Sequence, residues 1–268
     1  MIEPIRFKPK KSFGQNFLKD ANDLRSIAVA ACRLREKEST RVFEIGAGLG
    51  ALTASLLEQQ AQVEAIERDR DLIPILRQTF HSALETGQLI LHEANATTFF
   101  SAYSSKVVIC GNLPYHLTSS ILFEMAKLHS CLSGCVFLMQ KEVAERIVAK
   151  PNNRVYGLLS VLLQSRFEVQ ILLHIPPESF WPSPKVESSV LELKPRSNPS
   201  EIDWEKFVLL VKAAFSQRRK TLSNSLKKFD SIESILHSIP ISPQSRAENL
   251  SFQEYERILQ CLEAGKKN

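Results

Sequence analysis

The sequence has few cysteines, and their arrangement fits neither a disulfide framework nor a metal site. Its 268 residues include five cysteines, an odd number, each within an apolar or helical segment. Such use of cysteine is typical of reduced, buried thiols in a cytosolic protein. Cys131 and Cys135 have C-x3-C spacing, but no second pair of cysteines or histidines completes a zinc site. The sequence therefore predicts no metal centre.

Long apolar runs are absent as well. No stretch approaches the roughly 20 apolar residues that a membrane span needs, and the basic N-terminal region lacks the apolar core of a signal peptide. We therefore expect a cytoplasmic protein with no membrane partner. The length of 268 residues suits one α/β domain of about 200 residues and a smaller second domain.

Acidic residues are missing from one segment near the C-terminus. Residues 212–228 contain six basic side chains and no acidic one, and residues 1–20 contain five basic side chains against two acidic ones. Because the net charge of the whole chain is only +5, the remaining residues carry a net charge of −4. Positive charge gathered in two segments indicates contact with a polyanion. The alternative is that these charges only solvate helix faces and a tail.

A glycine-rich turn follows the first clear strand pattern. The apolar stretch at residues 42–45, which includes Glu44, leads into Gly46-Ala47-Gly48-Leu49-Gly50 and then into a helical pattern. This order is the context of a nucleotide site, although the last glycine of the dinucleotide motif is missing. Glu67 ends the next strand, where a carboxylate can accept hydrogen bonds from both hydroxyls of a ribose. Glu44, with no diphosphate to cradle, favours a cationic ligand such as S-adenosylmethionine over NAD.

The most informative stretch is Gly111-Asn112-Leu113-Pro114-Tyr115, which follows the apolar run at residues 107–110. In an open α/β sheet, this edge is where ligands bind. Pro114 restricts Leu113 to extended geometry and has no N–H group, so Asn112 Oδ1 and the Leu113 carbonyl oxygen can both accept hydrogen bonds from an exocyclic amine. Tyr115 can stack on the ring that carries the amine. The alternative is a turn that caps a strand, with Tyr115 in the core.

Other polar and aromatic residues have candidate roles around this loop. Asn95 follows the strand at residues 89–91 and either holds the cofactor adenine or caps a turn. Phe180 and Trp181 lie beside Lys185 in a proline-rich loop that is typical of a base-stacking platform with a phosphate contact, although we expect Trp181 to fill the core. Further phosphate contacts are predicted at the N-terminus, in a loop near residue 150 and after residue 217, from Lys10, Lys11, Arg154, Arg218, Arg219 and Lys220.

The order of patterns predicts an α/β fold with about seven strands followed by helices alone. A linker of proline, serine and asparagine at residues 195–200 separates the two parts. We expect one domain at residues 1–195, with its basic segment 1–19 folded over the site, and a helical domain at residues 203–268. Asp20 is positioned to cap the helix that follows it, and Ser251 with Glu254 forms a capping-box pattern.

In combination, these motifs resemble one family, the ribosomal RNA small-subunit adenine N6,N6-dimethyltransferases. The resemblance covers nearly the whole chain and is carried by six motifs in the right order: residues 11–18, residues 44–50, Glu67, residues 112–115, residues 180–188 and residues 215–220. It implies a Rossmann-like class I methyltransferase fold, with a mostly parallel seven-stranded sheet and a small all-α C-terminal domain. Asn95 and Ala47 depart from the family, which usually has Asp and often has Pro at these positions.

The resemblance also implies the cofactor, the substrate and the site. S-adenosylmethionine would be held by Asn16, Leu18, Gly46, Glu67, Asn95 and Asn112, with Glu44 and Gly48 in the same turn. The target base would be held by Asn112 to Tyr115 and by Phe180. The substrate would be two adjacent adenosines near the 3′ end of small-subunit ribosomal RNA within a pre-30S particle, and the enzyme would be a monomer.

Three alternatives remain open at this point. The same amine-holding loop would serve a DNA adenine methyltransferase. A large-subunit ribosomal RNA methyltransferase shares the fold and much of the loop. A ribosome-assembly factor that binds RNA without methylating it would keep the basic segments.

Overall fold

The computed structural model describes residues 8–10, 13–95 and 106–264. The chain divides into two compact units. Unit 1 comprises residues 1–121, 130–144 and 170–194, and unit 2 comprises residues 122–129, 145–169 and 195–268. The predicted linker at residue 195 is where the chain enters the last part of unit 2, but unit 2 also takes residues 122–129 and 145–169 from the middle of the sequence.

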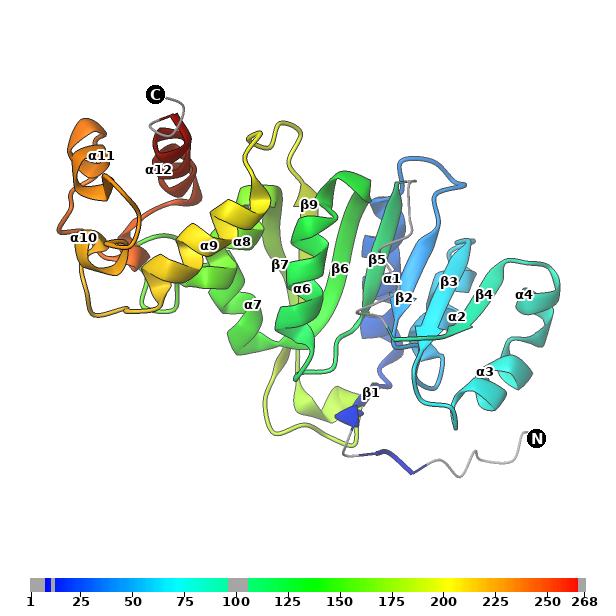
Figure 1. Cartoon of the computed structure of the whole chain (residues 1–268). Helices are drawn as coiled ribbons and strands as arrows, with labels where there is room; N and C mark the ends of the chain where they lie inside the picture. Colours follow the sequence, from blue (N-terminus) through cyan, green and yellow to red (C-terminus); the bar gives the residue numbers. More distant parts are fainter. Residues whose placement is uncertain (1–7, 11–12, 96–105, 265–268) are drawn as a thin grey trace. The chain divides into compact units, whose positions relative to one another are not determined.

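Within the described residues, the central sheet has seven strands in the order β4-β3-β2-β5-β6-β9-β7 (Figure 1). Parallel pairing joins β2 to β3 and β5, β3 to β4, and β5 to β6, whereas β9 is antiparallel to β6. The predicted mostly parallel sheet is thus confirmed. The strands of this sheet are β2 (Val42–Ile45), β3 (Val63–Glu67), β4 (Leu89–Glu93), β5 (Val107–Asn112), β6 (Leu132–Gln140), β7 (Phe167–Ile175) and β9 (Ser188–Pro195).

A second, two-stranded sheet pairs β1 (Phe17–Leu18) with β8 (Phe180–Trp181). The helices between the strands are α1 (Ala21–Arg33), α2 (Ala51–Glu58), α3 (Ile73–Thr79), α4 (His81–Glu85), α6 (Thr118–Lys127), α7 (Lys141–Val148) and α8 (Leu158–Arg166). The C-terminal helices are α9 (Trp204–Phe215), α10 (Leu222–Ser225), α11 (Ile232–Ser238) and α12 (Phe252–Ala264). Short 3-10 turns occur at His129–Cys131, Pro177–Ser179 and Ala247–Asn249.

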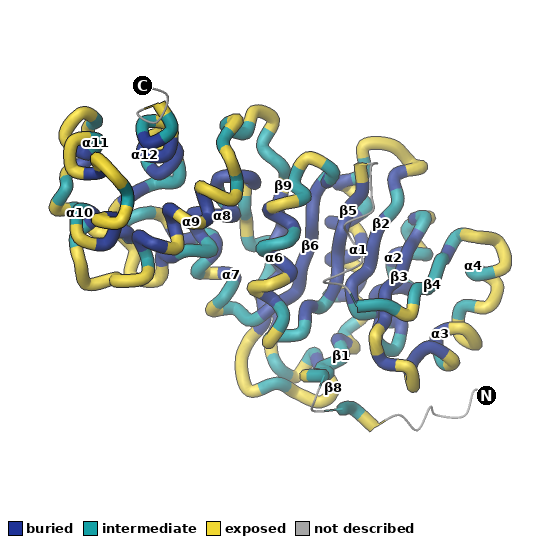
Figure 2. Tube along the Cα trace, in the orientation of Figure 1, coloured by how far each residue is buried: buried dark blue, intermediate teal, exposed yellow. Residues whose placement is uncertain are grey.

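The central strands are buried along most of their length, as Figure 2 shows for β2, β5 and β6. A parallel strand that is covered on both faces has apolar side chains on both sides. For this reason residues 107–110 are apolar throughout and do not alternate with polar residues. Helix α1 begins where the side chain of Asp20 accepts hydrogen bonds from the N–H groups of Asn22 and Asp23, as predicted. Its buried face, including Ile27 and Ala31, belongs to the same core as β2 and β5.

The order of the strands determines where a ligand can bind. Strand β2 lies between β3 and β5, so the connections from its neighbours lead in opposite directions along the sheet. A crevice forms at the carboxyl ends of the strands at such a switch point. Gly111 has φ +153° near the end of β5, and a Cβ atom there would lie 2.4 Å from the Ile45 carbonyl oxygen. Glycine therefore allows the end of β5 to approach the end of β2 closely.

Unit 2 has its own apolar core, formed by the buried faces of α8, α9 and α12, with Tyr156 and Phe207 among its largest side chains. The predicted capping box is present at α12, where the Ser251 N–H donates to Glu254 Oε2 at 2.8 Å and the Glu254 N–H donates to Ser251 Oγ at 3.3 Å. Among the helices in the described part of the chain, none combines the length and the apolar character that crossing a membrane requires.

Candidate active site

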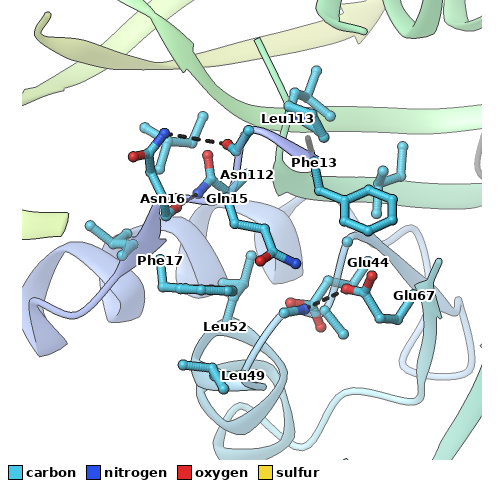
Figure 3. A pocket seen from close by; sticks show the side chains of 18 of the residues that line it. Phe13, Gln15, Asn16, Phe17, Glu44, Leu49, Leu52, Glu67, Asn112 and Leu113 are labelled. Atoms are coloured by element: carbon cyan, nitrogen blue, oxygen red, sulfur yellow. Dashed lines mark hydrogen bonds between the residues drawn. The ribbon is translucent and has the colours of Figure 1, made fainter. Parts of the chain in front are cut away.

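A cavity of about 660 Å³ lies at the carboxyl ends of β2, β3, β4 and β5. Its lining comes from segments that are distant in the sequence: the N-terminal residues 13–19, the glycine turn, the end of β3, Ala94 and Asn95, and the loop after β5 (Figure 3). The sequence-predicted residues that line it are Asn16, Leu18, Glu44, Gly46, Gly48, Glu67, Asn95, Asn112, Leu113, Pro114 and Tyr115. The fold thus brings both predicted subsites into one space.

Glu67 is held rigidly at the end of β3 by main-chain donors. Its Oε2 accepts from the Gly48 N–H at 2.8 Å (Figure 3). Its Oε1 accepts from the N–H groups of Arg68 and Asp69 at 2.7 Å each. A carboxylate has about four acceptor positions, so acceptor capacity remains for hydroxyl groups in the cavity. The glycine turn is therefore tied to the residue predicted to bind ribose.

Glu44 lines the same cavity but is almost fully buried, with 1% of its surface exposed. Burial raises the pKa of Glu44 to about 8; the hydroxyl of Thr53, which donates to Glu44 Oε2, lowers the pKa, and the neighbouring charge of Glu67 raises it. Burial, and to a smaller extent the charge of Glu44, hold the pKa of the Cys110 thiol well above its ordinary value. A carboxyl group in this setting favours a positively charged neighbour.

The side chain of Asn112 is oriented by the N-terminal segment. Its Nδ2 donates to the Asn16 carbonyl oxygen at 2.7 Å (Figure 3). Because a carbonyl oxygen only accepts, the amide nitrogen must face Asn16 and the amide oxygen must face the other way. Among the described residues, no group donates to Asn112 Oδ1. The site therefore offers a fixed acceptor at the position where the sequence predicts one.

The next three residues of the loop are fixed by main-chain and hydroxyl contacts. The Leu113 N–H donates to the Leu138 carbonyl on β6 at 2.9 Å, and Thr118 Oγ1 donates to the Pro114 carbonyl at 3.1 Å. The half-buried Tyr115 ring lines the cavity, and its hydroxyl lies 3.1 Å from Ser188 Oγ. The alternative of a fully buried Tyr115 in the core is therefore wrong.

The two aromatic residues of β8 take the reverse of their expected positions. The expectation that Trp181 fills the core is wrong, because 45% of its surface is exposed and it lines the cavity. Phe180 is 2% exposed, belongs to the core that includes α1, and is not among the described residues that line the cavity. The reason is strand alternation: neighbouring residues on β8 point to opposite sides, and the pairing with β1 stacks Trp181 on Phe17.

The predicted RNA contacts lie in several places. Lys185 is exposed on the proline-rich loop of unit 1, whereas the ammonium group of Lys10 is paired with Asp69 and Asp71. Lys11 lies outside the described residues. Unit 2 brings the others together: Arg218 Nη2 donates to the carbonyl oxygens of Arg154 (3.2 Å) and Tyr156 (3.1 Å). The exposed patch that results consists of Arg154, Arg218, Arg219 and Lys220.

Several residues at the site were not found from the sequence. Asp69 anchors the N-terminal segment, Thr53 contacts Glu44, and Ser188 contacts the hydroxyl of Tyr115. Arg68 also lines the cavity, and its guanidinium carbon lies 5.8 Å from the centre of the ring of Phe13, a residue of the predicted N-terminal motif. The position of Asp69, two residues beyond Glu67 at a strand end, was the one available signal, since carboxylates at that edge face ligands or neighbouring loops.

Comparison with known proteins decides the class of this site. The family model for ribosomal RNA adenine dimethylase matches residues 6–264. The chain belongs to the ribosomal RNA adenine dimethylase family. It is similar to the ribosomal RNA small subunit methyltransferase A of Nitrosospira multiformis, with 41% identity over 95% of this chain and 96% of that protein.

Solved structures agree with this family assignment. The crystal structure of a dimethyladenosine transferase from Plasmodium falciparum has a TM-score of 0.76 and 25% identity, and covers 94% of this chain and 98% of that one. The 23S rRNA methyltransferase ErmE has a TM-score of 0.70 at 23% identity, and covers 92% of this chain and 99% of that one; this likeness shows the shared fold. As a member of the dimethylase family, the chain is a methyltransferase that acts on adenine in ribosomal RNA.

Proposed function

We propose that this dimethylase transfers methyl groups from S-adenosylmethionine to N6 of two adjacent adenosines in a hairpin loop near the 3′ end of small-subunit ribosomal RNA. The observation that carries the proposal is the orientation of Asn112. Its amide nitrogen is bonded to the Asn16 carbonyl, so its amide oxygen is an acceptor in a cavity that also contains Glu67 and Glu44. The preference for the small subunit is supported by the relatives that are named for it.

The residues present fit S-adenosylmethionine. Glu67 retains acceptor capacity for ribose hydroxyls after its three main-chain bonds. Glu44 is a buried carboxyl group that a cation would stabilise in its charged form. Asn95 lines the cavity beyond Glu67, where its carbonyl can accept from the adenine amine. When bound, the cofactor supplies an electrophilic methyl group on a sulfonium.

The chain's own contribution to the reaction is to position the amine and stabilise the charge that develops on it. The lone pair of adenine N6 is delocalised into the ring, so the amine is a poor nucleophile. Asn112 Oδ1 and the Leu113 carbonyl oxygen can accept hydrogen bonds from its two N–H groups, and this localises the lone pair toward the methyl donor. Tyr115 holds the plane of the base by stacking, and Ser188 fixes the hydroxyl of Tyr115. No dedicated base is needed, because the proton becomes acidic only after transfer.

Two neighbouring residues of β8 are candidates for the aromatic side chain that stacks on the opposite side of the base. The family resemblance implies Phe180, which is buried, while Trp181 is the residue of β8 that lines the cavity.

The same site can accept a monomethylated base for a second transfer. The amine of that base has one N–H group left, and either Asn112 Oδ1 or the Leu113 carbonyl oxygen can accept a hydrogen bond from it.

Binding of the ribosomal particle is proposed for the basic residues. Arg154, Arg218, Arg219 and Lys220 form an exposed patch in unit 2, and Lys185 is exposed in unit 1. We propose that the protein acts as a monomer on a pre-30S particle, and therefore in the cytoplasm, where that substrate assembles.

Methyl transfer from tritiated S-adenosylmethionine to separated substrates tests the function. Small-subunit particles, large-subunit particles and adenine-containing DNA are offered in parallel, and labelled nucleosides are identified after digestion. We expect label in N6,N6-dimethyladenosine from small-subunit particles alone. Label from large subunits or DNA would replace the proposed substrate, and binding of small subunits without any label would favour a non-catalytic assembly factor.

A further inference from the structure

The N-terminal segment 13–18, called the strap below, is held at two points. At one end, Phe17 and Leu18 pair with Trp181 and Phe180 of β8, and the Lys19 N–H donates to the Ser179 carbonyl at 2.9 Å. At the other end, Gln15 Nε2 donates to Asp69 Oδ2 at 2.8 Å. The strap therefore lines the cavity between two anchors, one at β8 and the other at Asp69, two residues beyond the end of β3.

Asp69 is the centre of the second anchor. Its side chain is 2% exposed and accepts Lys10 Nζ at 2.5 Å on Oδ1 as well as Gln15 on Oδ2. Lys10 Nζ also lies 2.7 Å from Asp71 Oδ2, and the Lys10 N–H donates to Gln15 Oε1 at 2.7 Å. Burial alone would raise the pKa of Asp69, but the bonds from Lys10 and Gln15 outweigh it and hold the pKa below its ordinary value. The carboxylate is therefore charged and fully engaged.

Asn16 lies between these two anchors. Its carbonyl oxygen is the group that accepts Asn112 Nδ2 and so determines which end of the Asn112 amide faces the cavity. A side-chain amide without this partner is free to rotate by half a turn, which would present donors, rather than an acceptor, to an amine. The direction of the catalytic amide thus depends on where the strap places one carbonyl group.

We propose that Lys10 and Asp69 form a latch that positions Asn112 through the strap, so that Lys10 serves the methyl transfer itself rather than the binding of RNA. This inference rests on the proposed function. Lys10 and Asp69 touch neither the base nor the methyl donor in this scheme and are positioning residues. The latch acts through Gln15 and Asn16, which follow Lys10 in the chain.

A latch and a contact with RNA phosphate predict opposite effects of replacing Lys10 on the rate and on RNA affinity. A phosphate contact contributes to RNA affinity and to its dependence on salt, and leaves the rate in the bound complex unchanged. A latch contributes to the rate in the bound complex, because a misplaced Asn112 loses the acceptor geometry, and leaves the affinity for RNA nearly unchanged.

The test compares Lys10→Ala with Lys10→Arg and with the matched control Lys8→Ala. Lys8 is an exposed lysine of the same N-terminal segment. Single-turnover rates and KM for small-subunit particles are measured for each variant. We expect Lys10→Ala to lower the rate about 10-fold with KM within about 2-fold of the original, on the scale of a displaced catalytic group. Lys10→Arg retains a cation and is expected to recover most of the rate.

A spectroscopic measurement on the free protein makes the test independent of activity. The sequence has two tryptophans, so Trp204→Phe leaves Trp181, whose ring stacks on Phe17 of the strap with centroids 6.2 Å apart. Acrylamide quenching of Trp181 reports whether the strap is docked, and is recorded without RNA or cofactor. Lys10→Ala and Asp69→Asn are expected to increase quenching, whereas Lys8→Ala is not.

The outcomes separate the latch from the competing roles and from the proposed function. Unchanged quenching and an unchanged rate in Lys10→Ala, with a higher KM and a weaker salt dependence, would overturn the latch in favour of an RNA contact. A lower melting temperature alone, with the rate preserved, would overturn it in favour of a purely structural ion pair. Failure of the original protein to methylate small subunits would remove the proposed function, and increased quenching in Lys10→Ala would still support the latch.

Discussion

At the scale of single residues, the direction of one amide group determines what the site can hold. Asn112 donates to the Asn16 carbonyl, which leaves Oδ1 as an acceptor in the cavity. The residue types at the site were predictable from the sequence because Asn, Pro and Tyr follow a strand end. The orientation of the amide was not predictable, because its partner is separated from it by 96 positions in the chain.

Replacing Asn112 with alanine removes this acceptor. We expect Asn112→Ala to lower the single-turnover rate by about 100-fold or more, the scale of losing one preorganised polar group in an active site. RNA binding, measured separately by filter retention, should change little. Asn22→Ala is the matched control, since Asn22 carries an exposed amide side chain outside the cavity, and its bond to Asp20 is made by the main-chain N–H. Near-normal methylation by Asn112→Ala would contradict the assigned role.

Glu44 is expected to make the stability of the cofactor-free protein depend on pH. Burial raises the pKa of Glu44 from 4.5 to about 8. Between these values the folded state binds a proton that the unfolded state has lost, so stability decreases as the pH rises from about 5 to 8, by up to about 1.4 kcal/mol per pH unit. Melting temperatures of the original protein and Glu44→Gln across this range are the measurement. The decrease should be smaller in Glu44→Gln, and parallel curves would refute the raised pKa.

At the scale of elements, the site depends on how closely neighbouring strand ends approach each other. Strand β5 comes so near to β2 that a Cβ atom on Gly111 would lie 2.4 Å from the Ile45 carbonyl oxygen. The strands themselves were predictable, because buried parallel strands are apolar throughout. The short pairing of β1 with β8 was not, since Phe17 and Trp181 carry no strand pattern and their contact joins distant parts of the chain. The expected burial of Trp181 was wrong for the same reason.

The substitution Gly111→Ala tests how strongly the free energy of unfolding depends on this close approach. Both the positive φ and the contact with main-chain atoms oppose a side chain, and the contact cannot be relieved by a rotamer change. Gly87→Ala is the matched control, because Gly87 has φ +73° and nothing within 4 Å of the added Cβ. We expect Gly111→Ala to lower the free energy of unfolding by about 1–3 kcal/mol more than Gly87→Ala in urea titrations. Equal losses would mean that β5 can move away from β2.

At the scale of the whole molecule, positive charge is concentrated in two segments whose side chains have different surroundings. The basic residues near position 218 form an exposed patch in unit 2, although Arg218 itself also holds the loop at residues 154–156. Composition predicted the patch, because residues 212–228 have no acidic member. It could not predict that Lys10 is paired with two carboxylates, since Asp69 and Asp71 follow it by about 60 residues.

The contribution of the patch to RNA binding is measurable through salt. Removing two phosphate contacts with the double substitution Arg219→Ala and Lys220→Ala should weaken binding and reduce the slope of log K against log salt by roughly 1.5. Titrations between 50 and 200 mM salt, about the range over which such slopes are measured, give this value. Lys206→Ala is the control, because Lys206 is paired with Asp203 and Glu263. An unchanged slope would mean that Arg219 and Lys220 do not contact RNA phosphates.

The pairing of β1 with β8 has a consequence for the time at which a newly made chain becomes active. The residues that line the cavity up to Leu117 are all present once less than half of the chain has been synthesised, together with Asp69. The partner strand of Phe17 and Leu18 is Phe180–Trp181, and β9, which pairs with β6, follows it. A chain that stops before these residues therefore contains most of the residues that line the site but lacks the strand that pairs with Phe17 and Leu18. An incomplete chain that ends before residue 180 should accordingly be unable to methylate ribosomal RNA.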